Sequence, residues 1–133
     1  MIVADTNLVA YLLIEGTHTN AAKAVWETDW QWKLPTIWRS EFLDVLTTAV
    51  RAEVLTLDQA HATWQIALAT FGDSEIEPSG DDVLDRAAEW NLSAYDAQFA
   101  VAAADLGVPL VTADRRLLAA CKGLAVSPDQ FAR

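Results

Sequence analysis

The sequence contains little of what several classes of protein require. Its single cysteine, Cys121, excludes an internal disulfide and cannot form a thiolate zinc site alone. With only four prolines and 53% hydrophobic residues, the chain is neither disordered nor collagen-like. The longest unbroken hydrophobic run, Leu8 to Ile14, is too short to cross a bilayer. The N-terminus lacks the basic region of a secretory signal, so we expect a cytoplasmic protein with no membrane partner.

Basic residues are also scarce. Nine Lys and Arg residues against nineteen Asp and Glu residues give a net charge of −10. A protein that coats nucleic acid regardless of sequence needs a basic surface, so that class is excluded. An enzyme acting on nucleic acid is not excluded, because bound cations can supply the missing positive charge. No repeat, linker or low-complexity tract divides the 133 residues, so we expect one domain over 1–133.

Short hydrophobic segments alternate with helical patterns along the chain. The expected strands are 2–4, 31–34 (stopped by Pro35), 75–77, 108–112 and 124–126. The expected helices are 8–14, 20–27, 36–53, 114–121 and three that open at Thr56-x-x-Gln59, Ser79-x-x-Asp82 and Ser93-x-x-Asp96. Short apolar strands separated by helices predict an α/β fold with a short, mostly parallel central sheet flanked by helices on both faces.

Two aspartates follow expected strands directly. Asp5 ends the segment 2–4, and Asp114 comes just after 108–112. Parallel sheets bind ligands outside the carboxyl ends of their strands, so both positions are candidates for a functional site. Each aspartate could equally be the N-cap of the helix that follows it.

Two more carboxylates fall near hydrophobic helix faces. Glu41 lies at the edge of the apolar face of helix 36–53, where its side chain could reach inward or be solvated. Asp96 lies within the apolar face of the helix that Ser93 opens, and could also belong to a capping box there. The spacing predicts that this helix buries Tyr95, Phe99, Ala103 and Leu106.

The four carboxylates could converge at one edge of the sheet. Unpaired carboxylates held close together in a low dielectric repel and raise one another's pKa values. No pattern of lysines accompanies them, so a divalent cation is the simplest compensation. Oxygen ligands without His or Cys favour Mg²⁺ or Mn²⁺ over zinc. Such ions activate water and stabilise the transition state of phosphodiester hydrolysis.

Four segments, in order along the chain, resemble the conserved blocks of PIN-domain nucleases, and within them the VapC toxins of bacterial toxin–antitoxin pairs. They are Ile2-Val3-Ala4-Asp5-Thr6-Asn7, Ser40-Glu41, Tyr95-Asp96-Ala97 and Leu110-Val111-Thr112-Ala113-Asp114-Arg115-Arg116-Leu117. The resemblance covers essentially the whole chain. It implies a PIN-like domain and a Mg²⁺- or Mn²⁺-dependent ribonuclease that cuts single-stranded or loop RNA.

The resemblance also implies roles for individual residues. Asp5, Asp96 and Asp114 would hold metal directly, while Glu41 would bind metal or orient a coordinated water. Asn7 and Thr112 match the polar positions that support this cup of carboxylates. Some relatives carry a fifth acidic residue shortly after the fourth, but here Arg116 and Leu117 follow instead, which argues against a second metal.

Partners are implied as well: an RNA substrate, a second copy of the chain in a homodimer, and a small basic DNA-binding antitoxin. The antitoxin's tail would cover the acidic groove, which fits the net charge of −10. Arg39, Arg115 and Arg116 stand beside the candidate ligands and could hold RNA phosphates or simply be solvated. We expect most of the tryptophans to be core residues, with one or two free to stack on bases or to contact the antitoxin.

Two other functions remain open from the sequence. One is a degenerate, non-catalytic PIN-fold module that binds a protein partner. The other is a phosphatase that uses Asp5 as a nucleophile in an aspartyl-phosphate mechanism. Those enzymes usually carry a second aspartate two residues later, where this chain has Asn7.

Overall fold

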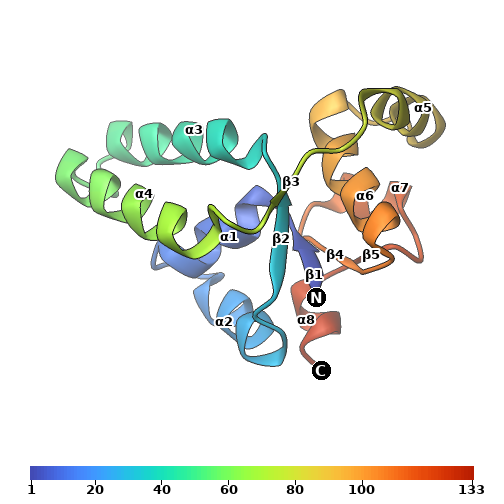
Figure 1. The fold of residues 1–133 in the computed structure, drawn as a ribbon. Helices are drawn as coiled ribbons and strands as arrows, with labels where there is room; N and C mark the ends of the chain where they lie inside the picture. The colour runs from blue at the N-terminus through green and yellow to red at the C-terminus, as the bar shows by residue number, and fades with distance from the viewer.

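The computed structural model describes all residues from Met1 to Arg133. Five parallel strands form one sheet in the order β3-β2-β1-β4-β5 (Figure 1). The strands are β1 (Ile2–Ala4), β2 (Trp32–Pro35), β3 (Glu75–Ile76), β4 (Leu110–Val111) and β5 (Ala125–Val126). The helices are α1 (Thr6–Leu13), α2 (Thr19–Thr28), α3 (Trp38–Arg51), α4 (Leu57–Phe71), α5 (Gly80–Trp90), α6 (Ala94–Leu106), α7 (Arg115–Ala120) and α8 (Pro128–Phe131).

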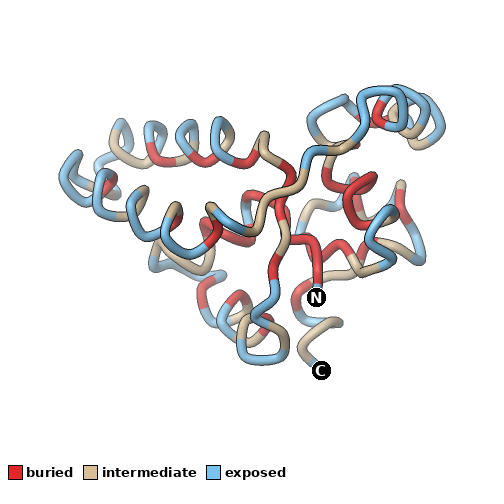
Figure 2. The backbone as a smooth tube through the Cα atoms, viewed as in Figure 1, coloured by how far each residue is buried: buried red, intermediate tan, exposed pale blue.

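The sheet is covered on both faces, as its apolar strands predict. Ile2 and Ala4 of β1 pack into a core with α1 to α4, whereas Val3 packs into a second core with α5 to α7. This alternation follows from the period of two along a strand. In Figure 1 the two groups of helices lie on opposite sides of the strands, and Figure 2 shows the buried backbone concentrated along and beside the sheet. The predicted α/β fold is confirmed.

Most of the helix signals in the sequence are confirmed. Thr56 and Gln59 form a reciprocal capping box at the start of α4, and Gly72 is the C-cap of that helix. Ser79 and Ser93 accept backbone N–H groups as the N-caps of α5 and α6. The short helix α8 was not predicted, although Ser127 and Gln130 form a capping box with Pro128 at its first turn.

Two strand predictions need correction. The segment 108–112 was expected as a strand, but β4 is only Leu110–Val111, because the Val108 N–H still bonds to Ala103 O at the end of α6. Pro35 was expected to stop β2 but is its last residue. The neighbouring N–H groups of Leu34 and Thr36 donate to the β3 segment, so the missing N–H of Pro35 does not interrupt that ladder.

The prediction for the buried face of α6 was half wrong. Phe99 and Ala103 are buried, but Tyr95 is 61% exposed and Leu106 is 39% exposed. Both lie in end turns of a 13-residue helix that covers strands of only two to four residues, so the helix ends extend past the sheet. The exposed ring of Tyr95 stands beside the site described below.

The tryptophans are mainly core residues, as expected. Trp32 and Trp38 are completely or almost completely buried, and both rings contact Phe71. Trp30 differs, since it is 65% exposed. Cys121 is buried and unpaired, as a small apolar residue would be. None of the helices combines the length and the apolar character required to span a membrane.

Candidate functional site

A single cavity opens where the order of the strands reverses, outside the carboxyl ends of β1 and β4. All four predicted carboxylates line it. The lining residues are Asp5, Thr6, Asn7, Ile37, Ser40, Glu41, Asp44, Val45, Tyr95, Asp96, Phe99, Asp114 and Leu117. None of them is basic, so the cavity combines several carboxylates with no internal counter-charge. The site lies where parallel sheets bind ligands.

Each of the four carboxylates stands at the beginning of a helix. Asp5 is the N-cap of α1 and Asp114 is the N-cap of α7. Glu41 and Asp96 lie in the first turns of α3 and α6. The N-terminus of a helix carries a partial positive charge, so each helix offsets part of the negative charge that it brings to the cavity. Capping and site formation are therefore performed by the same side chains.

Asp5 is fixed by hydrogen bonds to both of its carboxylate oxygens. The Leu8 N–H donates to Oδ1 at 2.9 Å, and the Thr112 hydroxyl donates to Oδ2. The oxygen of Thr112 also accepts the Asp114 N–H at 3.0 Å. Asp114 Oδ1 in turn accepts the N–H groups of Arg116 and Leu117 at 2.8 and 3.1 Å. Two carboxylates from opposite ends of the chain thus share one rigid network.

Glu41 is held from the neighbouring helix. The Thr6 hydroxyl donates to Glu41 Oε1 at 2.7 Å, joining the start of α1 to the first turn of α3. Across the cavity, the Asp96 N–H donates to Ser93 Oγ at 3.1 Å. Glu41 and Asp96 are both intermediate in exposure, and not fully solvated as a simple surface residue would be.

The pKa values of three carboxylates in the cavity are raised, as expected for carboxylates that are held close together and partly buried. Burial raises the pKa of Asp5 from 3.8 to about 6, and the charges of Asp114 and Glu41 add to the rise against the hydrogen bonds from Thr112 and Leu8. Burial also raises the pKa of Glu41, with a further contribution from Asp96. The pKa of Asp96 is raised by burial and by Asp114. Each of these carboxylates thus feels at least one of the others.

Asp44 and Tyr95 are among the lining residues that were not assigned to the site from the sequence alone. Asp44 follows Glu41 by three residues, so both project from the same side of α3 into the cavity. This i,i+3 spacing was a usable signal, and it supplies a fifth carboxylate from a helix, not from the segment after Asp114. Tyr95 also lines the cavity, although its spacing had placed it in the core.

The remaining predicted residues are distributed unevenly. Asn7 lines the cavity. Thr112 does not line it, but its hydroxyl donates a hydrogen bond to Asp5, which does. Arg115 and Arg116 are exposed at the start of α7, outside the lining.

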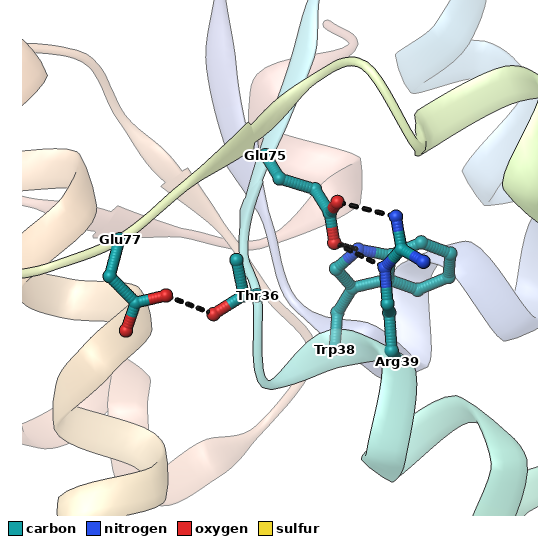
Figure 3. A network of polar contacts seen from close by, with 5 residues as sticks. All are labelled: Thr36, Trp38, Arg39, Glu75 and Glu77. Carbon is teal, nitrogen blue, oxygen red and sulfur yellow. Dashed lines mark hydrogen bonds and ion pairs between the residues drawn. The ribbon is translucent and has the colours of Figure 1, made fainter.

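Arg39 is directed away from the cavity and engaged by another residue. Its Nε and one terminal nitrogen donate to the two oxygens of Glu75 at 2.7 and 2.6 Å, as Figure 3 shows. The Trp38 indole N–H donates to the same carboxylate at 2.8 Å. Glu75 of β3 therefore anchors the first turn of α3, which carries Glu41. Arg39 is not among the residues that the fold brings to the cavity.

The donor set fits a hard divalent cation. Its side-chain donors are carboxylate, hydroxyl and amide oxygens, with no imidazole or thiolate. The mutual effects on pKa indicate negative charge that a cation would relieve. No three acidic, His or Cys side chains are already arranged as a metal cage, so binding would require small side-chain movements. Glu41 and Asp114 each keep one carboxylate oxygen free of hydrogen bonds within the chain and can make such movements, whereas Asp5 is held in place by Leu8 and Thr112.

The fold is an α/β domain with a carboxylate-lined cavity where the strand order of its sheet reverses. The profile of the PIN domain matches residues 2–123, and the chain belongs to the PIN domain family. PIN domains are generally nucleases. No curated protein matches the sequence.

Several solved structures share the fold. PAE2754 from Pyrobaculum aerophilum is 25% identical with a TM-score of 0.77, covering 98% of this chain and 85% of that one. A toxin–antitoxin complex from Klebsiella pneumoniae contains a chain that is 24% identical with a TM-score of 0.66, covering 96% and 98%. FitAcB from Neisseria gonorrhoeae is 17% identical with a TM-score of 0.71 and the same coverages, 96% and 98%.

Proposed function

We propose that the chain is an endoribonuclease that requires Mg²⁺ or Mn²⁺ and acts as the toxin of a toxin–antitoxin pair. The observation that carries this proposal is the gathering of Asp5, Glu41, Asp96 and Asp114 in one cavity without a basic residue. Family membership supports hydrolysis of nucleic acid, and the all-oxygen donor set supports a hard cation. The metal would activate water and stabilise the negative charge that develops on the phosphate.

The chain's own residues would divide the work as follows. Asp5, Asp96 and Asp114 hold the cation; Asp114 has its second oxygen, Oδ2, free of hydrogen bonds within the chain. Glu41 Oε1 is occupied by Thr6, which leaves Oε2 to bind the cation or to orient a water and accept its proton. Asn7, which also lines the cavity, would support the bound water or phosphate.

The proposed partner is a small basic antitoxin. One of the similar structures is described as a toxin–antitoxin complex, and its chain aligns over 96% of this one. The net charge of −10 favours a basic partner, because opposite charges speed and orient docking. We also propose a homodimer, which light scattering of the purified chain would test.

Phosphoryl transfer to Asp5 is less consistent with the site. A nucleophilic carboxylate oxygen must be open to attack on phosphorus, but Asp5 is only 6% exposed and both of its oxygens accept hydrogen bonds. Each oxygen keeps a second lone pair, so the same hydrogen bonds leave room for a small cation. A binding module without activity would have no need for carboxylates that raise one another's pKa. Neither alternative is favoured by a separate observation.

The experiment that tests the proposal is cleavage of a long single-stranded phage RNA by the purified chain. We expect cleavage with Mn²⁺ or Mg²⁺, none with EDTA, and recovery when the metal is restored in excess. Preparation in parallel of the Asp96→Asn variant excludes contaminating ribonucleases. Cleavage that persists in EDTA, or that is equal in the variant, would contradict the proposal.

A further inference from the structure

Tyr95 presents an unpartnered aromatic ring at the acidic cavity. It is 61% exposed, lines the cavity with Asp5, Glu41 and Asp114, and directly precedes Asp96. The aromatic pairs of the fold do not include its ring, and its hydroxyl makes no hydrogen bond within the chain. Most of the Tyr95 surface is therefore open to an external partner. The exposed ring of Tyr95 is suited to stack on an aromatic ring of a ligand.

A basic side chain lies near the start of α6. Arg116 is close enough to Asp96 to lower its pKa, against the effects of burial and of Asp114. Arg116 also lines a second hollow, together with Trp90, Asn91 and Ser93, next to the start of α6. The start of α6 thus borders both hollows, since Tyr95 and Asp96 line the acidic cavity and Ser93 lines the hollow that contains Arg116. A strand of nucleic acid crossing this edge would meet an aromatic ring and a cation together.

We propose that Tyr95 stacks on the nucleobase beside the scissile phosphate and thereby selects unpaired nucleotides as substrate. This inference rests on the proposed ribonuclease function. A phosphate that reaches the carboxylates and their cation leaves its own base at the rim, where the exposed ring of Tyr95 lies. The base can lie flat on that ring only when it is free of a duplex. Stacking accepts every base, so Tyr95 would favour single strands without reading sequence.

Three variants separate stacking from other roles of this position. Tyr95→Phe keeps the ring, and Tyr95→Leu removes it with a residue that also favours a helix. Trp30→Leu is the matched control, because Trp30 is similarly exposed at 65% but lines a different hollow with Met1 and Phe71. Kinetics are measured on a short single-stranded RNA taken from a cleavage site mapped in the phage RNA. A 2-aminopurine base next to that site reports stacking through its fluorescence, with Ca²⁺ in place of Mg²⁺.

We expect Tyr95→Leu to raise KM about 5- to 150-fold, the range of a lost base–aromatic stack, with kcat changed less than about threefold. The same variant should lose the quenching of 2-aminopurine, while Tyr95→Phe and Trp30→Leu should match the wild type. Equal KM and quenching in Tyr95→Leu would overturn the inference while leaving the ribonuclease function intact. A change of oligomeric state without a change of KM would also overturn it, because Tyr95 would then contact a second copy. If the wild type neither binds nor cleaves RNA, both proposals fail.

Discussion

Asp5 and Thr112 lie 107 positions apart in the chain, yet the Thr112 hydroxyl donates a hydrogen bond directly to Asp5 Oδ2. The same hydroxyl oxygen accepts the N–H of Asp114. One buried threonine therefore holds the Asp5 carboxylate and the Asp114 backbone, which follow β1 and β4, the two adjacent strands where the sheet order reverses. This connection converts two separate helix caps into parts of one site.

Replacement of Thr112 by valine should weaken metal binding. Valine keeps the shape of threonine but removes the hydroxyl, so Asp5 loses a hydrogen bond and Asp114 loses an acceptor for its N–H. Loss of a residue that orients ligands typically lowers metal affinity by about 10- to 100-fold. Calorimetric titration with Mn²⁺ measures this, with Thr112→Ser as the control that retains the hydroxyl. Equal Mn²⁺ affinity in Thr112→Val would show that this network does not support the site.

Asp96→Asn should abolish cleavage without unfolding the protein. Asparagine retains the backbone N–H that Ser93 accepts, but it removes a charged metal ligand. We expect kcat to fall by about 100-fold or more, as when another charge-stabilising group is removed from an active site. Asp82→Asn is a close control, because Asp82 follows Ser79 in α5 as Asp96 follows Ser93 in α6. Full activity in Asp96→Asn would mean that Asp96 is only a helix-terminal residue.

The stability of the metal-free protein should fall as the pH rises from 4 to 7. The pKa of Asp5 is raised from 3.8 to about 6, so folding favours its protonated form. The resulting stabilisation is fully present below the unfolded pKa and is lost as the pH rises through the folded pKa. The loss is about 3 kcal/mol, since one pKa unit corresponds to about 1.4 kcal/mol. Urea unfolding across this range should show it, and Asp5→Asn should flatten the profile.

A stability profile that rises steadily from pH 4 to 7 would contradict this prediction. Glu75 and Asp29 act with the opposite sign, because their pKa values are lowered by Arg39 and by the N-terminal amine, respectively. Their contributions are lost only as the pH falls through those lowered values. They therefore lie mainly below the range in which Asp5 titrates.

Arg39 and Arg116 should behave differently in RNA binding. Arg39 is paired with Glu75, so Arg39→Gln should lower the melting temperature but leave KM nearly unchanged. Arg116 is exposed beside Asp96, so Arg116→Gln should raise KM and reduce the salt dependence of binding by about one phosphate contact. Titrations at several salt concentrations compare the two variants. The reverse pattern would place the phosphate path along α3 instead of α7.

Much of this site can be predicted from the sequence because the residues that begin helices α1, α6 and α7 also bring the carboxylates to the cavity. Asp5 and Asp114 were recognisable as residues that follow buried strands, and Ser93 marked the helix that presents Asp96. The predictions for Tyr95 and Arg39 were wrong because the positions of both side chains depend on elements that are distant in the sequence. Tyr95 has the spacing of a core residue but lies in a helix turn beyond the short sheet. Arg39 stands two residues from Glu41, yet Glu75, 36 residues away, determines its orientation.

The most direct test is a crystal structure of the protein with Mn²⁺, with anomalous scattering used to locate the ion. Side chains that move slightly to enclose a cation are the central requirement, since they are not yet arranged as a cage. We predict one strong anomalous peak bound by Asp5, Asp96 and Asp114, with Glu41 bound directly or through water. A cavity without such a peak at saturating Mn²⁺, with the four carboxylates each solvated separately, would contradict the assignment.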